Sequence, residues 1–240
     1  MQKLIERVRA AAFDLDGTLV DSAPDLADAA NAMLKLLGYP LLAERRIAAM
    51  IGGGVDRLIE RALAESTGST DAAPRAAMLR IARDAFHQHY ATRLYQRSRV
   101  YPGVLEALET LARSGLRLCC VTNKASVFAL PLVEAAGLSR LFAFVICADD
   151  PENRKPSPAL LLETCRRFEV RPEELLCVGD SAADVAAARA AGCPIAAVSY
   201  GYNGERPVAL ERPDWLIGSL TEIAGLPDAS HATPVHARGG

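Results

Sequence analysis

The sequence of 240 residues contains no apolar run that reaches the roughly 18–20 residues of a membrane-spanning helix. It also lacks a basic excess, because 27 Lys and Arg stand against 29 Asp and Glu. A nucleic-acid-binding surface is usually basic, so this balance argues against that class. The first residues lack the apolar stretch and small-residue cleavage site of a secretory signal. We therefore expect a cytoplasmic protein that binds neither membranes nor nucleic acids.

Cysteine and histidine are sparse, and they are not arranged as metal ligands. The six cysteines form no CxxC pair, and none of the four histidines stands at zinc-finger spacing. Most cysteines lie in apolar runs such as LCCVTN and LLCVGD, which indicates small buried residues in a reducing compartment. The few histidines give little support to a histidine-based catalyst.

Half of the residues are hydrophobic, and beyond residue 96 they alternate between two patterns. Segments with helical periodicity are each followed by a short apolar run, namely LRLCCVTN, FAFVICADD, LLCVGD and PIAAVS. This alternation predicts a parallel sheet with helices on both faces. The apolar run at residues 8–15 would join that sheet, because an isolated strand leaves its backbone groups unpaired. The predicted fold class is thus α/β, with a Rossmann-like parallel-sheet core.

Residues 21–95 show only helical periodicity. In PDLADAANAMLKLLG the apolar residues recur at spacings of three and four, and Gly38 follows where a helix would end. This pattern predicts a small α-helical cap domain inserted into the core. The core would comprise residues 1–20 and 96–226, the cap residues 21–95, and residues 227–240 a disordered tail.

Polar side chains stand at the end of four predicted strands. Ligands of parallel sheets bind beyond the carboxyl ends of the strands, so we expect these side chains to meet in one site. They are Asp14, Asp16, Thr122, Asn123, Lys124, Lys155, Asp180 and Asp184.

Two neighbouring carboxylates such as Asp14 and Asp16 need a cation to lie close together at a strand end. Mg²⁺ prefers oxygen ligands and often binds substrate phosphate as well. A carboxylate facing that phosphate can act as a nucleophile, and Lys155 would neutralise phosphate charge. Each residue alone has a plainer interpretation, for example a turn for the Asp-x-Asp pair or a helix N-cap for Asp180. Their combination favours phosphoryl transfer.

Four stretches, DLDGTLVDS, VTNK, RKPSP and GDSAADVAAARAAG, resemble the four motifs of the haloacid dehalogenase superfamily of phosphatases. The inserted helices resemble the small α-helical cap of one class of that superfamily. FDLDGTLVDSAPDLADAAN, IGGGVDRLIERAL and ADDPENRKPSPALLLE are similar to those of its bacterial members that hydrolyse 2-phosphoglycolate. The resemblance extends from about residue 8 to about residue 225.

The resemblance implies a role for each motif residue. Asp14 would accept the phosphoryl group, and Asp16 would protonate the leaving oxygen and then activate water. Thr122 and Asn123 would hold the phosphoryl group, while Lys155 would steady Asp14 and the phosphate charge. The implied ligands of Mg²⁺ are the Asp14 side chain, the Asp16 backbone carbonyl, Asp180 and, directly or through water, Asp184.

The cap would select the substrate. The resemblance places the loop of residues 52–54 over the active site. The backbone N–H groups of Gly53 and Gly54, and the side chain of Arg57, would bind the carboxylate of a small acid phosphate such as 2-phosphoglycolate. A plainer interpretation makes Arg57 an exposed partner of Glu60 and the glycines a helix break.

The predicted function is magnesium-dependent hydrolysis of a phosphomonoester, with a small phosphorylated metabolite as partner and 2-phosphoglycolate as the expected substrate. Another small-molecule phosphatase, a pyrophosphatase or a sugar-phosphate mutase of the same superfamily stays open, because all share the core. From another class, a receiver-like phosphoacceptor switch would hold its phosphate, but Asp16 and the cap argue against it. The sequence leaves the oligomeric state open between monomer and homodimer.

Overall fold

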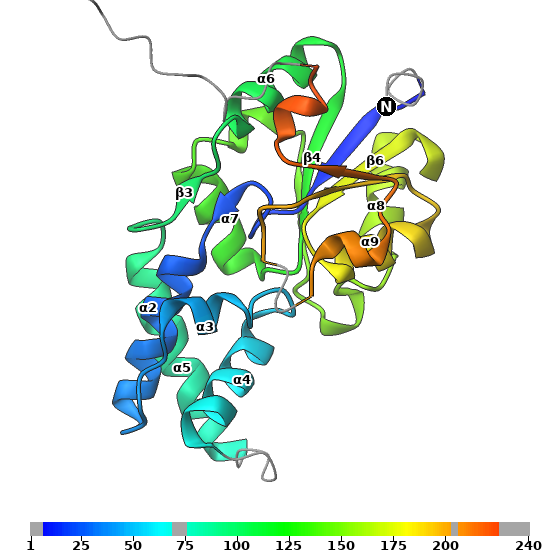
Figure 1. Ribbon diagram of the computed structural model, residues 1–240. Coiled ribbons are helices and arrows are strands. Elements are labelled where there is room, and N and C mark those ends of the chain that lie inside the picture. Colours follow the sequence, from blue (N-terminus) through cyan, green and yellow to red (C-terminus); the bar gives the residue numbers. More distant parts are fainter. Residues whose placement is uncertain (1–6, 69–75, 203–205, 226–240) are drawn as a thin grey trace, which may run out of the picture.

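The main element of the computed structural model is a six-stranded parallel sheet with helices on both faces (Figure 1). The structure describes residues 7–68, 76–202 and 206–225. The strand order is β5-β4-β1-β6-β7-β8, and every neighbouring pair is parallel. The strands are β1 (Ala10–Phe13), β4 (Arg117–Thr122), β5 (Val145–Cys147), β6 (Leu175–Gly179), β7 (Ile195–Val198) and β8 (Trp215–Ile217). This architecture confirms the predicted α/β class.

Each strand residue faces one of two hydrophobic layers, because successive side chains of a strand point to opposite faces. In β1, Ala11 and Phe13 lie in the layer that includes α6 (Val104–Arg113) and α7 (Ser126–Ala135). Ala10 and Ala12 lie in the layer of α8 and α9. The second pair of helices spans Ala159–Phe168 and Ala182–Ala191, respectively. Burial on both faces explains why the strands are continuously apolar.

Four helices form a second unit beside the sheet, seen in the lower part of Figure 1. They are α2 (Ala23–Leu36), α3 (Glu44–Ala48), α4 (Val55–Thr67) and α5 (Ala76–Arg93). Their apolar faces pack into a third cluster, which is separate from the two layers of the sheet. Gly38 has φ of +75°, a conformation that suits a glycine just beyond the end of α2. This helical unit is called the cap below.

A short antiparallel ribbon connects the cap to the sheet. It pairs β2 (Val20–Asp21) with β3 (Arg99–Val100), at the predicted junctions between core and cap. The buried carboxylate of Asp25 accepts hydrogen bonds from the backbone N–H groups of Arg97 and Ser98, and so holds the returning chain. Strands of two residues are too short for a periodic pattern, so the sequence does not predict this ribbon.

The remaining elements are the short strand β8 and several short 3₁₀ helices. The sequence pattern also does not predict β8, in which Leu216 is exposed. The predicted tail at 227–240 lies outside the described residues. Among those residues, no helix is both long enough and apolar enough to cross a membrane. The 3₁₀ helices are η1 (Ser139–Leu141), η2 (Pro151–Asn153), η3 (Pro172–Glu174), η4 (Val208–Glu211) and η5 (Leu220–Glu222).

Candidate active site

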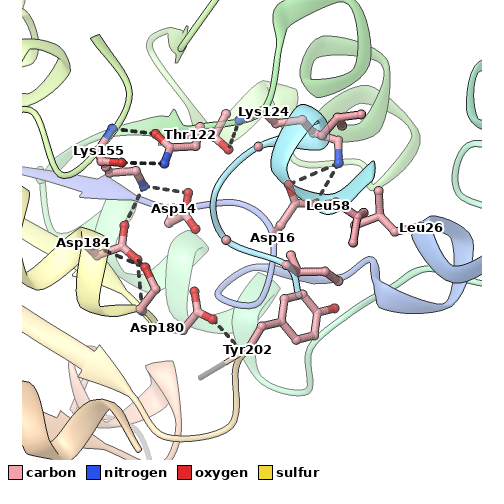
Figure 2. Close-up of a pocket in the computed structure, with 16 residues that line it drawn as sticks. Asp14, Asp16, Leu26, Leu58, Thr122, Lys124, Lys155, Asp180, Asp184 and Tyr202 are labelled. Carbon is pink, nitrogen blue, oxygen red and sulfur yellow. Dashed lines mark hydrogen bonds and ion pairs between the residues drawn. The ribbon is translucent and has the colours of Figure 1, made fainter. Parts of the chain in front are cut away.

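A cavity lies between the carboxyl ends of the strands and the cap (Figure 2). It brings together most of the residues that the sequence singles out. The core contributes Asp14, Asp16, Thr122, Asn123, Lys124, Lys155, Asp180, Ser181, Asp184 and Tyr202. The cap contributes Leu26, Ile51, Gly52, Gly54, Val55 and Leu58. The core side is therefore charged, and the cap side is largely apolar.

Lys155 joins two of the carboxylates. Its ammonium lies 2.7 Å from Asp14 Oδ1 and 2.6 Å from Asp184 Oδ1, and it donates to the carbonyl oxygen of Val121 at 2.9 Å. Figure 2 shows Lys155 between these two aspartates. Burial opposes the positive charge, but Asp14 and Asp184 outweigh it and raise the pKa of Lys155 above its ordinary value. The three oxygens that contact Lys155 thus provide one acceptor for each of the three N–H donors of its ammonium.

Asn123 holds the loop that carries Lys155. Its side-chain nitrogen donates to the carbonyl oxygen of Lys155 at 3.0 Å, and its oxygen accepts from the backbone N–H of Lys155 at 2.7 Å. The side-chain amide is thus engaged on both sides by the protein itself. Thr122 lies next to it on the cavity wall, and its hydroxyl oxygen accepts from the backbone N–H of Lys124 at 3.1 Å. The hydroxyl hydrogen of Thr122 is therefore left to donate elsewhere.

Asp14, Asp180 and Asp184 form a group that fits a metal ion. Each offers an oxygen, and these oxygens lie within 4.8 Å of one another. Burial raises the pKa of Asp14 to about 7, against the opposing charge of Lys155. Three ionised carboxylates and the Lys155 ammonium sum to a charge of −2, which one divalent cation would neutralise. Oxygen donors of this kind suit Mg²⁺, so the residues fit the metal that the sequence predicts.

Asp180 is the member of this group that most needs a cation. It is 2% exposed, and burial followed by repulsion from Asp184 raises its pKa well above the ordinary value. Within the described part of the chain, no cationic side chain forms an ion pair with it. Neutral donors hold it in place instead: Thr18 Oγ1 at 2.9 Å and the backbone N–H of Tyr202 at 2.6 Å.

Gly17 allows the first motif to approach Asp180. Its φ is +88°, a conformation that side chains rarely adopt. A Cβ atom at this position would stand 2.3 Å from Asp180 Oδ2. The glycine that follows Asp16 in the sequence is therefore required by close packing as well as by the turn.

Asp184 lies in the first turn of α9 and completes a capping box with Ser181. Its Oδ2 accepts from the backbone N–H of Ser181 at 3.0 Å, while Oδ1 faces Lys155. Ser181 is the N-cap of this helix, so the plainer interpretation of Asp180 as a cap does not apply.

Asp16 faces the same cavity but contacts a different lysine. The ammonium of Lys124 lies 3.0 Å and 3.1 Å from the two carboxylate oxygens of Asp16, and Ser22 Oγ donates to Oδ1 at 2.5 Å. The ring of Tyr90, on α5 of the cap, covers Lys124 with its centroid 4.8 Å from the ammonium. The sequence places Lys124 at the strand end but assigns it no role.

Gly53 and Arg57 do not line this cavity. Both line a neighbouring cavity that also contains Arg61 and Arg206. For Arg57 the physical reason is the helical rotation of about 100° per residue, since Leu58 occupies the face of α4 that meets the carboxylates. Of the three cap residues predicted to bind substrate, the structure brings only Gly54 to the site.

Sequence reasoning assigned no role to Thr18, Lys124, Ser181 and Tyr202. Thr18, Lys124 and Ser181 lie within the quoted motifs, so a signal for them is present. Tyr202 lies in the loop that follows β7, and nothing in its neighbourhood in the sequence indicates its contact with Asp180.

The parallel sheet and the carboxylates and lysines at its edge are those of an α/β enzyme with a site that could hold a metal ion. The chain belongs to the haloacid dehalogenase-like hydrolases, whose family model matches residues 8–192. It is 46% identical to phosphoglycolate phosphatase of Nitrosospira multiformis over 91% of this chain and 95% of that protein. The phosphoglycolate phosphatase of Thiobacillus denitrificans is 43% identical over 90% of this chain and 94% of that protein.

A solved structure supports the same relationship. The crystal structure of a predicted phosphoglycolate phosphatase from Haemophilus somnus superposes with a TM-score of 0.87 at 35% identity. The match covers 91% of this chain and 97% of that one, so it includes both the sheet and the cap.

Proposed function

We propose that this enzyme hydrolyses 2-phosphoglycolate to glycolate and phosphate, with Mg²⁺ as its metal and Asp14 as its nucleophile. Two relatives named for that activity match along nine tenths of the chain, which supports the substrate. One observation carries the mechanism: Asp14 faces the cavity beside Asp16 while also belonging to the oxygen group with Asp180 and Asp184.

The first step transfers the phosphoryl group to the protein. A carboxylate oxygen of Asp14 attacks phosphorus, and the bond from phosphorus to the ester oxygen of glycolate breaks. Asp16 donates a proton to that oxygen, so glycolate leaves with a neutral hydroxyl group in place of an alkoxide. Lys155 stays beside Asp14 and stabilises the negative charge that gathers there, and Thr122 donates its hydroxyl to a phosphate oxygen.

The second step releases phosphate. Asp16, now ionised, removes a proton from water, and the resulting hydroxide attacks the phosphorus of the aspartyl-phosphate. The bond between phosphorus and the Asp14 oxygen breaks, which restores the Asp14 carboxylate and the protonated Asp16. Asp14, Asp180 and Asp184, with the backbone carbonyl of Asp16, would hold Mg²⁺, which supplies positive charge next to the phosphate when bound.

The surroundings of the site agree with a small substrate handled away from water. Leu26, Ile51, Val55 and Leu58 cover the carboxylates from the cap side.

The six cysteines are all free, and five of them are buried, as in proteins of a reducing compartment. We accordingly place the enzyme in the cytoplasm.

A substrate panel tests the proposal. We expect kcat/KM with Mg²⁺ to be at least ten-fold higher for 2-phosphoglycolate than for hexose phosphates, nucleotides or pyrophosphate. Chelation of the metal should abolish turnover of every ester. A strong preference for a hexose phosphate would overturn the substrate and leave the aspartate-based reaction standing. If phosphate instead stays bound to the protein without repeated release, the proposal that the protein is a phosphatase fails.

A further inference from the structure

Lys124 is a buried cation at the active site that the two steps above do not use. It follows β4, and the residue is 4% exposed. Burial opposes its charge, but the carboxylate of Asp16 outweighs this and raises the pKa of Lys124 above its ordinary value. The cavity is lined by this ammonium directly beside Asp16 (Figure 2).

Lys124 has donor capacity that Lys155 lacks. Lys155 already donates to three acceptors, whereas the hydrogen-bond acceptors of the Lys124 ammonium both belong to Asp16. The ring of Tyr90 lies over the ammonium, with its centroid 4.8 Å away, and the buried Tyr90 hydroxyl has no hydrogen-bond partner among the described residues. Lys124 can therefore donate to one more anionic oxygen without giving up Asp16.

The described residues of the cap offer no competing positive charge to this cavity. The described cap residues that line it are glycines and aliphatic side chains, and Arg57 lines the neighbouring cavity instead. An anionic group of the substrate, other than the phosphate that faces Asp14, therefore finds its counter-charge on the core side. Among the described lining residues, Lys124 and Lys155 are the two cations.

We propose that Lys124 binds the carboxylate of the substrate and so determines the preference for a phosphorylated two-carbon acid, an inference that rests on the proposed function. In 2-phosphoglycolate a single carbon separates the ester oxygen from the carboxylate. Asp16 must reach that ester oxygen to protonate it. A cation in contact with Asp16 is therefore within reach of the carboxylate one carbon further along.

Tyr90 keeps Lys124 in this position. The aromatic ring lies on one side of the ammonium and Asp16 on another, so the lysine side chain is held between the cap and the core. Aromatic faces attract ammonium groups most strongly where water is excluded. The carboxylate subsite is therefore pre-arranged before substrate enters, which lowers the cost of binding.

The test compares an acid substrate with a neutral one. Lys124→Met is assayed with 2-phosphoglycolate and with ethyl phosphate, which has the same number of carbons but no carboxylate. We expect the ratio of the two kcat/KM values to fall at least ten-fold relative to wild type. Lys124→Arg, which keeps the charge, should retain part of that preference. Lys124→Gln provides a second neutral variant, and Lys35→Met, on the exposed face of α2, controls for loss of a lysine.

Each outcome decides between interpretations. An equal loss for both substrates would overturn the proposal, because it would reduce Lys124 to a positioning residue for Asp16. Selectivity that is lost in Arg57→Met but kept in Lys124→Met would also overturn it, in favour of the cap arginine. If wild type shows no preference for 2-phosphoglycolate over ethyl phosphate, the proposed function fails first, and that failure is visible without any variant.

Discussion

At the scale of single residues, the buried carboxylates of the active site lower the stability of the folded protein. Asp14 and Asp180 are held in surroundings that disfavour their ionised forms, and burial is the largest cause for both. Lys155 relieves this only for Asp14 and Asp184. A bound divalent cation would relieve it for all three aspartates, so the metal is expected to stabilise the fold as well as the reaction.

The pH dependence of stability tests this cost. Folding raises the pKa of Asp14 from 3.8 to about 7, so in that range the folded state binds more protons than the unfolded state. The contribution of Asp14 to stability therefore falls as the pH rises from about 4 to 7, by about 1.4 kcal/mol per pH unit within that window at most. In chelator, we expect Asp14→Asn to become progressively more stable than wild type across that range. Above pH 7 the difference should level off.

Chemical denaturation at several pH values measures this difference. Asp84→Asn, which removes an exposed carboxylate of α5, serves as the matched control. A stability difference between Asp14→Asn and wild type that is the same at pH 4 and pH 8 would contradict the account. Addition of Mg²⁺ should stabilise wild type more than Asp14→Asn at pH 8.

At the scale of elements, α7 of the core makes a contact that belongs to the cap. Phe128 is 3% exposed and lies in the hydrophobic cluster of the cap helices. Its ring centroid is 5.2 Å from that of Tyr90 and 5.0 Å from that of His87, both on α5. The same Tyr90 covers Lys124. Phe128 thus packs against the cap beside Tyr90, which covers Lys124 of the active site.

Removal of this ring should act on catalysis more than on folding. Phe128→Ala deletes the apolar contact between α7 and α5, while the cap keeps the packing of α2, α4 and α5 with one another. We expect kcat/KM for 2-phosphoglycolate to fall at least ten-fold, mainly through KM, because the cap covers the cavity less of the time. The melting temperature should change less than in Phe142→Ala, whose ring contacts Phe13 inside the sheet layer. If Phe128→Ala loses as much stability as Phe142→Ala but keeps the wild-type KM, then Phe128 makes an ordinary core contact and does not act through closure of the cap.

The secondary-structure elements that the sequence predicts correctly are those with a clear local pattern. The strands β1, β4, β6 and β7 are buried on both faces and follow one another with helices between, so their apolar runs are readable. The ribbon of β2 and β3 is not readable, because each strand has two residues and their pairing joins segments nearly eighty positions apart. Arg57 illustrates a third case: its type suits an anion, but the helical rotation of α4 decides which cavity it faces.

At the scale of the whole molecule, the candidate site is predictable because it is built on strand ends. A parallel sheet brings the ends of β1, β4 and β6 to one edge, so Asp14, Thr122 and Asp180 meet whatever the loops do. Contacts that depend on the cap or on distant loops were not predictable. The pairing of Lys124 with Asp16 under Tyr90, and of Tyr202 with Asp180, requires three-dimensional placement that no local pattern encodes.

The most direct test of the account is to find where the phosphoryl group is held during turnover. The enzyme with Mg²⁺ is mixed with 2-phosphoglycolate, quenched in acid within a single turnover, reduced with borohydride and mapped by mass spectrometry. Reduction converts an aspartyl-phosphate to homoserine, so the account predicts homoserine at position 14 and an unmodified Asp16. Modification of a different residue, or full release of phosphate with position 14 unmodified at every time point, would contradict it.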